Sequence, residues 1–228
     1  QQHARPEALA GMARFGIDVE RRFGVPVPDL RRIARRLGRD HALALALWRT
    51  GVPDAQLLAG LVADPARLDA RQMDAWVHTI RSWDVCDGAC LNAFVHSPLA
   101  WDRVAAWAVR HDEFVRRAAF ALLATLAVHD EAAADARFVQ ALALVEAAAD
   151  DGRNFVRKAV NWALRNIGKR NAALHAAALA CAQRLQERDS RSARWIAADA
   201  LRELRSAAVR RRHAAAAEAV SASGTRPA

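Results

Sequence analysis

The hydrophobic and polar residues of this chain alternate with the period of amphipathic helices. In residues 28–38, Leu30, Ile33, Ala34 and Leu37 fall on one face, and arginines fill the other. Apolar residues recur at similar spacing in the segments that follow, and prolines separate several of these segments. The pattern predicts no strand and further helices at 39–50, 54–63, 70–82, 85–96, 99–110, 113–128, 135–149, 154–167, 171–186 and 191–207.

Three of the predicted helices resemble one another in sequence. "FVRRAAFALLATL" begins at Phe114, "FVRKAVNWALRNIG" begins 41 residues later at Phe155, and "SARWIAADALREL" begins a further 37 residues along at Ser192. A period near 40 residues with two helices per unit is typical of HEAT-like repeats. We therefore predict an all-α fold of HEAT-like repeats, stacked into a curved superhelical solenoid with a concave face.

The equal register of these three helices predicts that their basic residues lie on one side of the stack. The formal net charge of +9, carried almost entirely by arginine, favours a polyanionic partner, and a GC-rich genome that raises both Ala and Arg is the alternative origin of this charge. We expect this side to bind an anionic partner, and its charge alone does not choose between DNA, RNA and a membrane surface. Its candidate residues are Arg116, Arg117, Arg157, Lys158 and Arg194.

Composition and length predict one folded domain over residues 1–207 and a basic, Ala-rich, partly disordered tail over 208–228. Three cysteines do not make a disulfide framework, and the N-terminal residues do not form the apolar region of a leader peptide. No stretch of about 18 apolar residues is free of charge, so we expect no membrane span. These features predict a cytoplasmic protein, associated with the nucleoid in a bacterium.

Cys86 and Cys90 are the first candidates for metal binding, since they are four residues apart on a predicted helix. His78 or His96 could complete such a site, but structural zinc sites have two paired ligand clusters, and Cys181 is isolated. Small thiols packed between helices are the preferred interpretation. We expect neither a metal nor a cofactor.

Nucleophilic and nucleotide-dependent enzymes are disfavoured, because the chain has neither a Gly-x-Ser-x-Gly elbow nor a phosphate-binding glycine loop. The segment "WDVCD" remains, in which Trp83 and Asp87 share a helical face. The segment also admits a structural interpretation. Trp83 would pack at a helix end, and Asp84 would cap a helix beginning at Val85. The negative charge of Asp87 would stabilise the first turn of that helix.

Several motifs in this order resemble those of the AlkD-type DNA alkylation repair glycosylases. These are HEAT-like repeat proteins that excise N3- and N7-alkylated purines, and the resemblance covers nearly the whole chain. The motifs are "GMARFGI" (11–17), "FGVPVPDLRRIA" (23–34), "SWDVCD" (82–87), "FVRRAAF" (114–120), "KAVNWALRNIGKRN" (158–171) and "SARWIAADALREL" (192–204).

The resemblance implies a role for each matching residue. Trp83 and Trp162 would hold the cationic nucleotide by face contacts to its deoxyribose, Asp87 would be the catalytic carboxylate, and Arg117 would grip backbone phosphate. Phe15 stands where the best-studied family pattern has tyrosine, so a ring contact to the lesion is kept and a hydroxyl hydrogen bond is lost. The implied partner is double-stranded DNA carrying alkylated purines, with its phosphates on the basic helices and the base kept within the duplex. Nothing in the sequence requires a dimer, so we expect a monomer.

Two other functions compete with excision. A catalytically inactive relative would bind duplex or structured DNA through the same face, and a protein-interaction scaffold would need an apolar or mixed concave face. The Arg-rich helices disfavour the scaffold. The presence of Trp83, Asp87, Arg117 and Trp162 favours the glycosylase, because a pure binder has little use for a carboxylate that faces phosphate.

Overall fold

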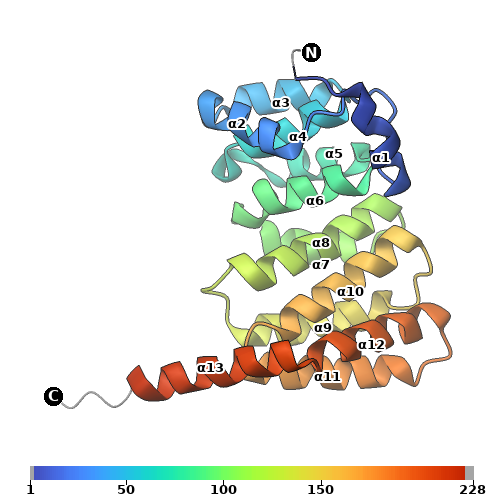
Figure 1. Cartoon of the computed structure of the whole chain (residues 1–228), viewed down its shortest axis with the longest axis vertical. Helices are drawn as coiled ribbons and strands as arrows, with labels where there is room; N and C mark the ends of the chain where they lie inside the picture. The colour runs from blue at the N-terminus through green and yellow to red at the C-terminus, as the bar shows by residue number, and fades with distance from the viewer. Residues whose placement is uncertain (1–2, 224–228) are drawn as a thin grey trace. The chain divides into compact units, whose positions relative to one another are not determined.

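The computed structural model describes residues 3–223, and all of the regular structure in this range is helical (Figure 1). It contains thirteen α-helices and three short 3₁₀ helices within the described residues. The all-α prediction is therefore confirmed. The chain divides into two compact units, residues 1–122 and 123–228, so that the division falls within one helix, α8 (Glu113–His129).

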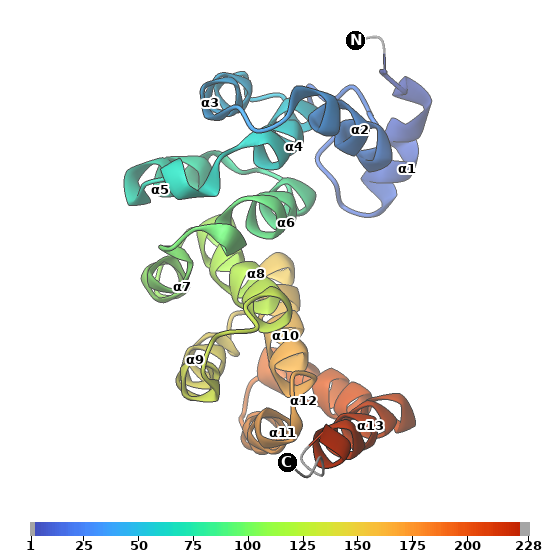
Figure 2. The ribbon, with the colours of Figure 1, turned by 90° about the vertical axis from the view of Figure 1, so that its left-hand side faces the viewer.

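The first unit consists of two layers of helices (Figure 2). Helices α3, α5 and α7 form one layer, and α2, α4 and α6 form the other. Three 3₁₀ turns, at 6–8, 65–67 and 94–96, lie between or before these helices. The helices are α1 (Leu9–Arg14), α2 (Val27–Leu37), α3 (His41–Arg49), α4 (Pro53–Val62), α5 (Ala70–Thr79), α6 (Trp83–Asn92) and α7 (Ala100–Ala108), followed by the first part of α8.

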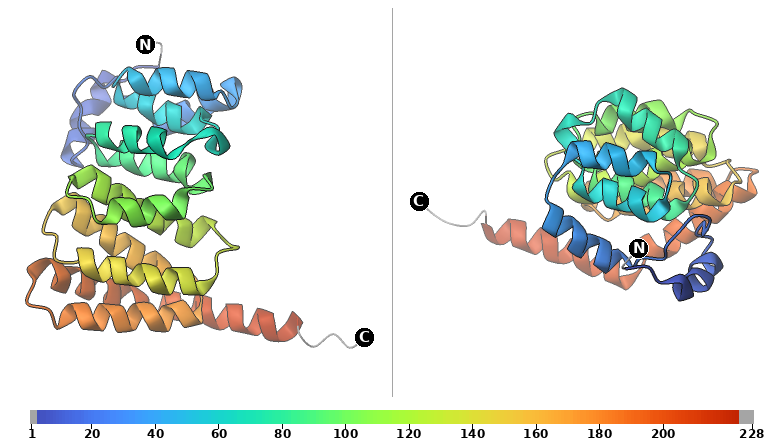
Figure 3. Two further views of the ribbon diagram at one scale, coloured as in Figure 1. Left: turned by 180° about the vertical axis from the view of Figure 1, so that it is seen from behind. Right: turned by 90° about the horizontal axis from the view of Figure 1, so that it is seen from above.

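The second unit repeats this arrangement after the end of α8. Helices α9 and α11 form one layer, and α10 and α12 form the other, while α13 projects beyond them (Figure 3). The helices are α9 (Asp135–Ala148), α10 (Asn154–Gly168), α11 (Ala172–Gln186), α12 (Arg191–Leu204) and α13 (Ala207–Ser223).

The helix starts reproduce the sequence repeat. Helices α8, α10 and α12 begin at residues 113, 154 and 191, with the same intervals as the three similar segments. Helix α13 occupies the first part of the expected tail, and the last five residues of the chain lie outside the described residues. The expectation of a single domain over residues 1–207 stays a prediction.

Side-chain caps fix several of the helix starts. Asp40 accepts a hydrogen bond from the Leu43 amide at 2.9 Å and begins α3. Asp69 and Gln72 form a reciprocal capping box at the start of α5. Asn171 caps α11 in the same way as Asp40 caps α3. Each of these side chains satisfies an amide that the helix itself leaves without a partner.

Three predicted helices differ from the structure by three residues or more at one end. The helix predicted at 70–82 ends at Thr79, because Ile80 is extended, and the helix predicted at 85–96 begins at Trp83 and ends at Asn92. The helix predicted at 191–207 ends at Leu204, and α13 begins after a two-residue break. The earlier start of α6 places Trp83 within the helix.

A row of aromatic rings fills the first unit. Trp48 and Trp76 stack in parallel with their ring centroids 4.0 Å apart, and Phe94 lies 5.9 Å from Trp76 and 5.6 Å from Trp107. The rings come from α3, α5, the 3₁₀ turn at 94–96 and α7, so they join successive helices of the layer that α3, α5 and α7 form. Trp48 and Trp107 are buried in this core, whereas Trp101 is only half-buried.

Close packing in the second unit depends on a glycine at the end of α10. A methyl group added at Gly168 would lie 2.7 Å from Leu204 Cδ2 and 2.8 Å from Ala178 Cβ. Gly168 therefore lets α10 approach both α11 and α12. Nearby, the buried Asn166 side chain donates to the Ala124 carbonyl at 3.0 Å, which ties α10 to the end of α8.

In the part of the chain that the structure describes, no helix combines the length and the apolar character that crossing a membrane requires.

We expect Gly168→Ala to lower the free energy of unfolding by about 1–3 kcal/mol, because the methyl group overpacks the contact with Ala178 and outweighs the better helix propensity of alanine. Gly152→Ala is the matched control, since nothing lies within 4 Å of its added methyl group. Denaturant unfolding measures both variants. Equal stability of the two would contradict this account of the packing.

Candidate functional site

Trp83, Asp87 and Arg117 meet where α6 packs against α8. Trp83 begins α6, and Asp87 follows one turn later on the same face. Arg117 comes from the second turn of α8, and it donates from Nε to Asp87 Oδ1 at 3.1 Å and from Nη2 to Oδ2 at 2.8 Å. Its guanidinium carbon lies 5.9 Å from the centroid of the Trp83 ring. The structure thus brings together three of the predicted site residues.

The charges of this cluster are partly withdrawn from water. Arg117 is buried, and the Asp87 side chain keeps 21% of its surface exposed. Burial raises the pKa of Asp87 above that of an ordinary aspartate, and the neighbouring Arg117 opposes this rise without cancelling it. Burial also disfavours the charged form of Arg117, but the Asp87 carboxylate outweighs this effect and raises the pKa of Arg117. The guanidinium therefore stays charged beside an acid that is easier to protonate than usual.

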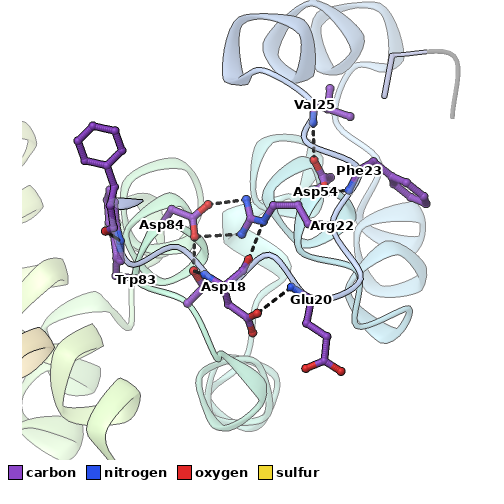
Figure 4. A network of polar contacts seen from close by, with 10 residues as sticks. Asp18, Glu20, Arg22, Phe23, Val25, Asp54, Trp83 and Asp84 are labelled. Carbon is purple, nitrogen blue, oxygen red and sulfur yellow. Dashed lines mark hydrogen bonds and ion pairs between the residues drawn. The ribbon is translucent and has the colours of Figure 1, made fainter. Parts of the chain in front are cut away.

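The N-terminal segment is fixed to the first turn of α6 by a second ion pair (Figure 4). Arg22 donates to both oxygens of Asp84, at 2.7 Å and 3.1 Å, and its Nε donates to the Asp18 carbonyl at 2.9 Å. The Ser82 hydroxyl donates to Asp84 Oδ1 at 2.5 Å and accepts from the Asp18 amide at 3.1 Å. The side chain of Arg22 is almost completely buried.

This network explains why Asp84 does not cap a helix beginning at Val85. Both of its oxygens are engaged by Arg22 and Ser82, so Asp84 lies inside the first turn, and Ser82 occupies the N-cap position. The structural interpretation of Asp84 as a helix cap is therefore wrong. The acid instead holds the segment around residue 22 against α6.

A third acid, Asp54 of α4, holds the next part of the same segment. Its two oxygens accept the amides of Phe23 at 2.8 Å and Val25 at 2.7 Å (Figure 4). Gly24 lies between them with φ +73°, and a Cβ there would lie 2.4 Å from the Arg5 carbonyl oxygen. Only glycine fits this position without displacing the chain.

This anchored segment carries Phe15 to the site. The Phe15 carbonyl accepts a hydrogen bond from Trp83 Nε1 at 3.1 Å, and the Phe15 side chain is 76% exposed. A phenyl ring this exposed forms part of no core. Its predicted contact with a lesion stays a prediction, and the structure places its main chain directly against Trp83.

The remaining predicted residues lie outside this cluster. Arg116 is half-buried in α8. Within the second unit, Trp162 is half-buried and Lys158 exposed on α10, and Arg157 stacks on Trp195. Arg194 of α12 is exposed and pairs with Asp189 at 3.2 Å. Trp83 belongs to the first unit and Trp162 to the second, and the expectation that both hold one nucleotide stays a prediction.

The cysteines beside Asp87 are buried, as predicted for packing thiols. Cys86 Sγ lies 3.9 Å from the Phe114 carbonyl oxygen, and Cys90 Sγ lies 3.5 Å from that of Ala118. Burial raises the pKa of Cys90 well above its usual range and that of Cys181 to about 12. Among residues 3–223, no three His, Cys, Asp or Glu side chains form a group that could hold a metal ion.

A cleft of about 870 Å³ in the first unit borders the start of α6, where Ser82 and Val85 line it. Its walls include Arg21, Arg49, Trp48 and Arg81, but neither Trp83 nor Asp87. The cluster of Trp83, Asp87 and Arg117 therefore does not line this hollow.

Sequence reasoning missed the residues that position the site. Arg22, Asp54 and Ser82 make long-range contacts over 29 to 64 residues of sequence separation, and their side-chain types are too common to identify a partner. One signal was present: Asp84 lies within the "SWDVCD" motif without an assigned role. Trp195 was also missed, although it lies in the third repeated segment.

Comparisons with known proteins identify the family and the fold of the chain. A family model described as DNA alkylation repair enzyme matches residues 1–204, whereas no curated protein sequence matches the chain. One similar solved structure is described as a new family of proteins related to the HEAT-like repeat DNA glycosylases, with affinity for branched DNA structures. It aligns with a TM-score of 0.73 and 21% identity over 88% of this chain and 90% of that chain. This likeness confirms the predicted HEAT-like fold.

We expect Asp84→Asn to lower the free energy of unfolding by about 3 kcal/mol, because it leaves the buried Arg22 guanidinium without its counter-charge. Asp29→Asn is the control, since its partner Arg32 is exposed and such pairs contribute less than about 1 kcal/mol. Denaturant unfolding of both variants checks the difference. Losses of the same size in both variants would show that the Arg22–Asp84 pair stabilises the fold no more than the Asp29–Arg32 pair does.

Proposed function

Because the chain belongs to the family of DNA alkylation repair enzymes, we propose that it is a DNA glycosylase that hydrolyses the N-glycosidic bond of cationic N3- and N7-alkylated purines in duplex DNA. We propose further that it acts as a monomer without a cofactor and leaves the damaged base within the duplex. One observation carries the proposal: a partly exposed indole, Trp83, and a partly exposed carboxylate, Asp87, lie one helical turn apart beside a guanidinium.

The chemistry of the substrate suits these two side chains. An N3- or N7-alkylated purine is positively charged, so it leaves with the bonding electrons as a neutral base and needs no strong general acid. Water then supplies the oxygen that joins C1′ of the sugar, and its proton passes to solvent. The Asp87 carboxylate stabilises the positive charge that develops on the sugar and orients the water. The Trp83 face adds cation–π attraction of roughly 0.5–2 kcal/mol.

Arg117 links DNA binding to the charge of Asp87 in this proposal. In the free protein its guanidinium holds both Asp87 oxygens and offsets their charge. A phosphate that approaches Arg117 competes with Asp87 for the same cation, because both are anions that suit the planar fork of arginine. DNA binding would thereby loosen the hold on the carboxylate at the moment when its charge is needed.

The other predicted residues supply affinity. Trp162 offers a second indole for the nucleotide, and Phe15 adds a ring contact next to Trp83. Arg116, Lys158 and Arg194 contact phosphates, which gives binding without reading sequence.

A second candidate function is a catalytically inactive protein that binds duplex or structured DNA. The two hydrogen bonds from Arg117 to Asp87 favour it, because they neutralise the carboxylate in the free protein. The relative with affinity for branched DNA structures has the same fold and makes this function a reasonable alternative. The two candidates differ in one result, which is whether Asp87 contributes to release of a base.

We expect the wild-type protein to release 7-methylguanine and 3-methyladenine from methylated duplex DNA, and Asp87→Asn to slow this release roughly 100-fold or more, since it removes the charge that stabilises the sugar cation. Chromatography of the freed bases under single-turnover conditions gives the rates. Asp29→Asn removes the same charge from the first turn of α2, where Asp29 pairs with the exposed Arg32, and should keep the wild-type rate.

Equal release by the wild type and Asp87→Asn would refute the role of Asp87. Duplex binding without release by the wild type would instead establish the inactive binder.

The pH dependence of excision should report the environment of Asp87. The carboxylate acts when ionised, so the rate should fall as the pH drops through its pKa, and burial places this acid limb above that of an ordinary aspartate. Arg117→Gln removes the group that lowers this pKa and should move the limb to still higher pH. Single-turnover rates across the pH range, corrected for spontaneous depurination, provide the measurement. A limb at the same pH in both proteins would exclude coupling between Arg117 and Asp87.

A further inference from the structure

Helices α10 and α12 of the second unit are joined by a ladder of side-chain contacts. The contacting residues are spaced by four positions on both helices, so they form one line along the seam. From the start of α10 to its end, the contacts are Arg157 with Trp195, Asn161 with Asp199, Arg165 with Asp199 and Glu203, and Lys169 with Glu203.

The later contacts of this ladder neutralise their own cations. Arg165 lies 2.5 Å from Glu203 and 3.6 Å from Asp199, and Lys169 Nζ lies 2.7 Å from Glu203. Asn161 donates to Asp199 at 2.6 Å. Burial opposes the charge of Glu203, but Lys169 and Arg165 overcome it and lower the pKa of this acid. The charges of Arg165 and Lys169 are therefore already matched within the protein.

The first contact of the ladder is different, because α12 presents an indole there instead of an acid. The guanidinium carbon of Arg157 lies 4.4 Å from the centroid of the Trp195 ring. Its one hydrogen bond within the described residues is a long one of 3.5 Å to Asn154, and its buried Nε has no partner there. The positive charge of Arg157 is held in place without being neutralised.

Trp195 is well placed to orient this guanidinium. Its side chain is 37% exposed, which is unusual for a tryptophan that has no other evident task. An aromatic face fixes the plane of an arginine, and a guanidinium held in one plane suits the two oxygens of a phosphate. Lys158, the next residue of α10, is exposed and adds a second cation.

We propose that Arg157 and Trp195 form a phosphate-binding site for the DNA backbone, in which Trp195 positions the arginine. Arg165 and Lys169 lie on the same seam but take no part in this site, because their charges are paired with acids of α12. The assignment rests on the proposed function only in that the protein binds duplex DNA, and it holds whether or not a base is excised.

Binding of unmodified duplex DNA at several salt concentrations tests this site. Each phosphate contact contributes about 0.9 to the slope of log K against log salt, so Arg157→Gln should flatten the slope by about that amount and weaken binding several-fold. Lys169→Gln, the matched control, removes a cation from the same helix and should leave the slope unchanged. Fluorescence anisotropy with a labelled duplex gives both slopes. An equal slope for the wild type and Arg157→Gln would overturn the proposal.

A double-mutant cycle tests the role of Trp195. Trp195→Ala should weaken binding in the wild-type background and have no further effect in Arg157→Gln, because the indole acts through the arginine. Trp195→Phe keeps an aromatic face and should retain most of the affinity, which also guards against a folding defect of the alanine variant. Equal losses from Trp195→Ala in both backgrounds would contradict the positioning role.

The outcomes separate this site from excision. If Arg157→Gln flattens the salt dependence of binding but the wild-type protein releases no base, the phosphate site is supported and the glycosylase is refuted. If the wild-type protein releases bases and Arg157→Gln leaves the salt dependence unchanged, the glycosylase is supported and the phosphate site is refuted.

Discussion

The structure around the candidate site depends on one compensated charge, the Asp87 carboxylate at the seam of α6 and α8. Burial penalises this charge, and the two hydrogen bonds from Arg117 keep it in a fixed place. The pair also fixes the distance between the two helices and the position of Trp83 relative to the guanidinium. A site in which one cation restrains one anion can respond to a second anion, and the phosphates of DNA are such anions.

Three aspartates near the start of α6 have separate tasks. Asp54 satisfies two backbone amides, and Asp84 pairs with a buried guanidinium and a hydroxyl. Both are fully used in building the protein. Asp87 is also ion-paired, but its side chain keeps more exposure, 21% against 16% for Asp84, and its partner Arg117 lies beside the Trp83 ring. The N-terminal segment that the first two acids hold is the one that carries Phe15, so these acids help to determine where the Phe15 carbonyl meets the Trp83 indole.

Much of the fold could be predicted from the sequence, because helical periodicity and the repeat of "FVRRAAF" and "FVRKAVN" are local patterns. The shared face of Trp83 and Asp87 followed from their spacing alone. The partner of Asp84 did not follow, because it lies 62 residues away and the chain offers 34 basic residues. For the same reason, the sequence identifies Arg117 as a basic residue but not Asp87 as its partner, which lies 30 residues away. The start of α6 was misplaced by two residues, because Ser82 and Asp84 both suit an N-cap and only tertiary contacts decide between them.

The burial of Cys86 and Cys90 has a consequence for durability. The thiolate is the reactive form of cysteine, and burial keeps the thiol of Cys90 protonated by raising its pKa. A protein proposed to work on alkylated DNA meets the same electrophiles that damage the bases. The buried thiols of Cys86 and Cys90, next to Asp87, are shielded from these electrophiles. The helix that carries the carboxylate is thereby protected from alkylation.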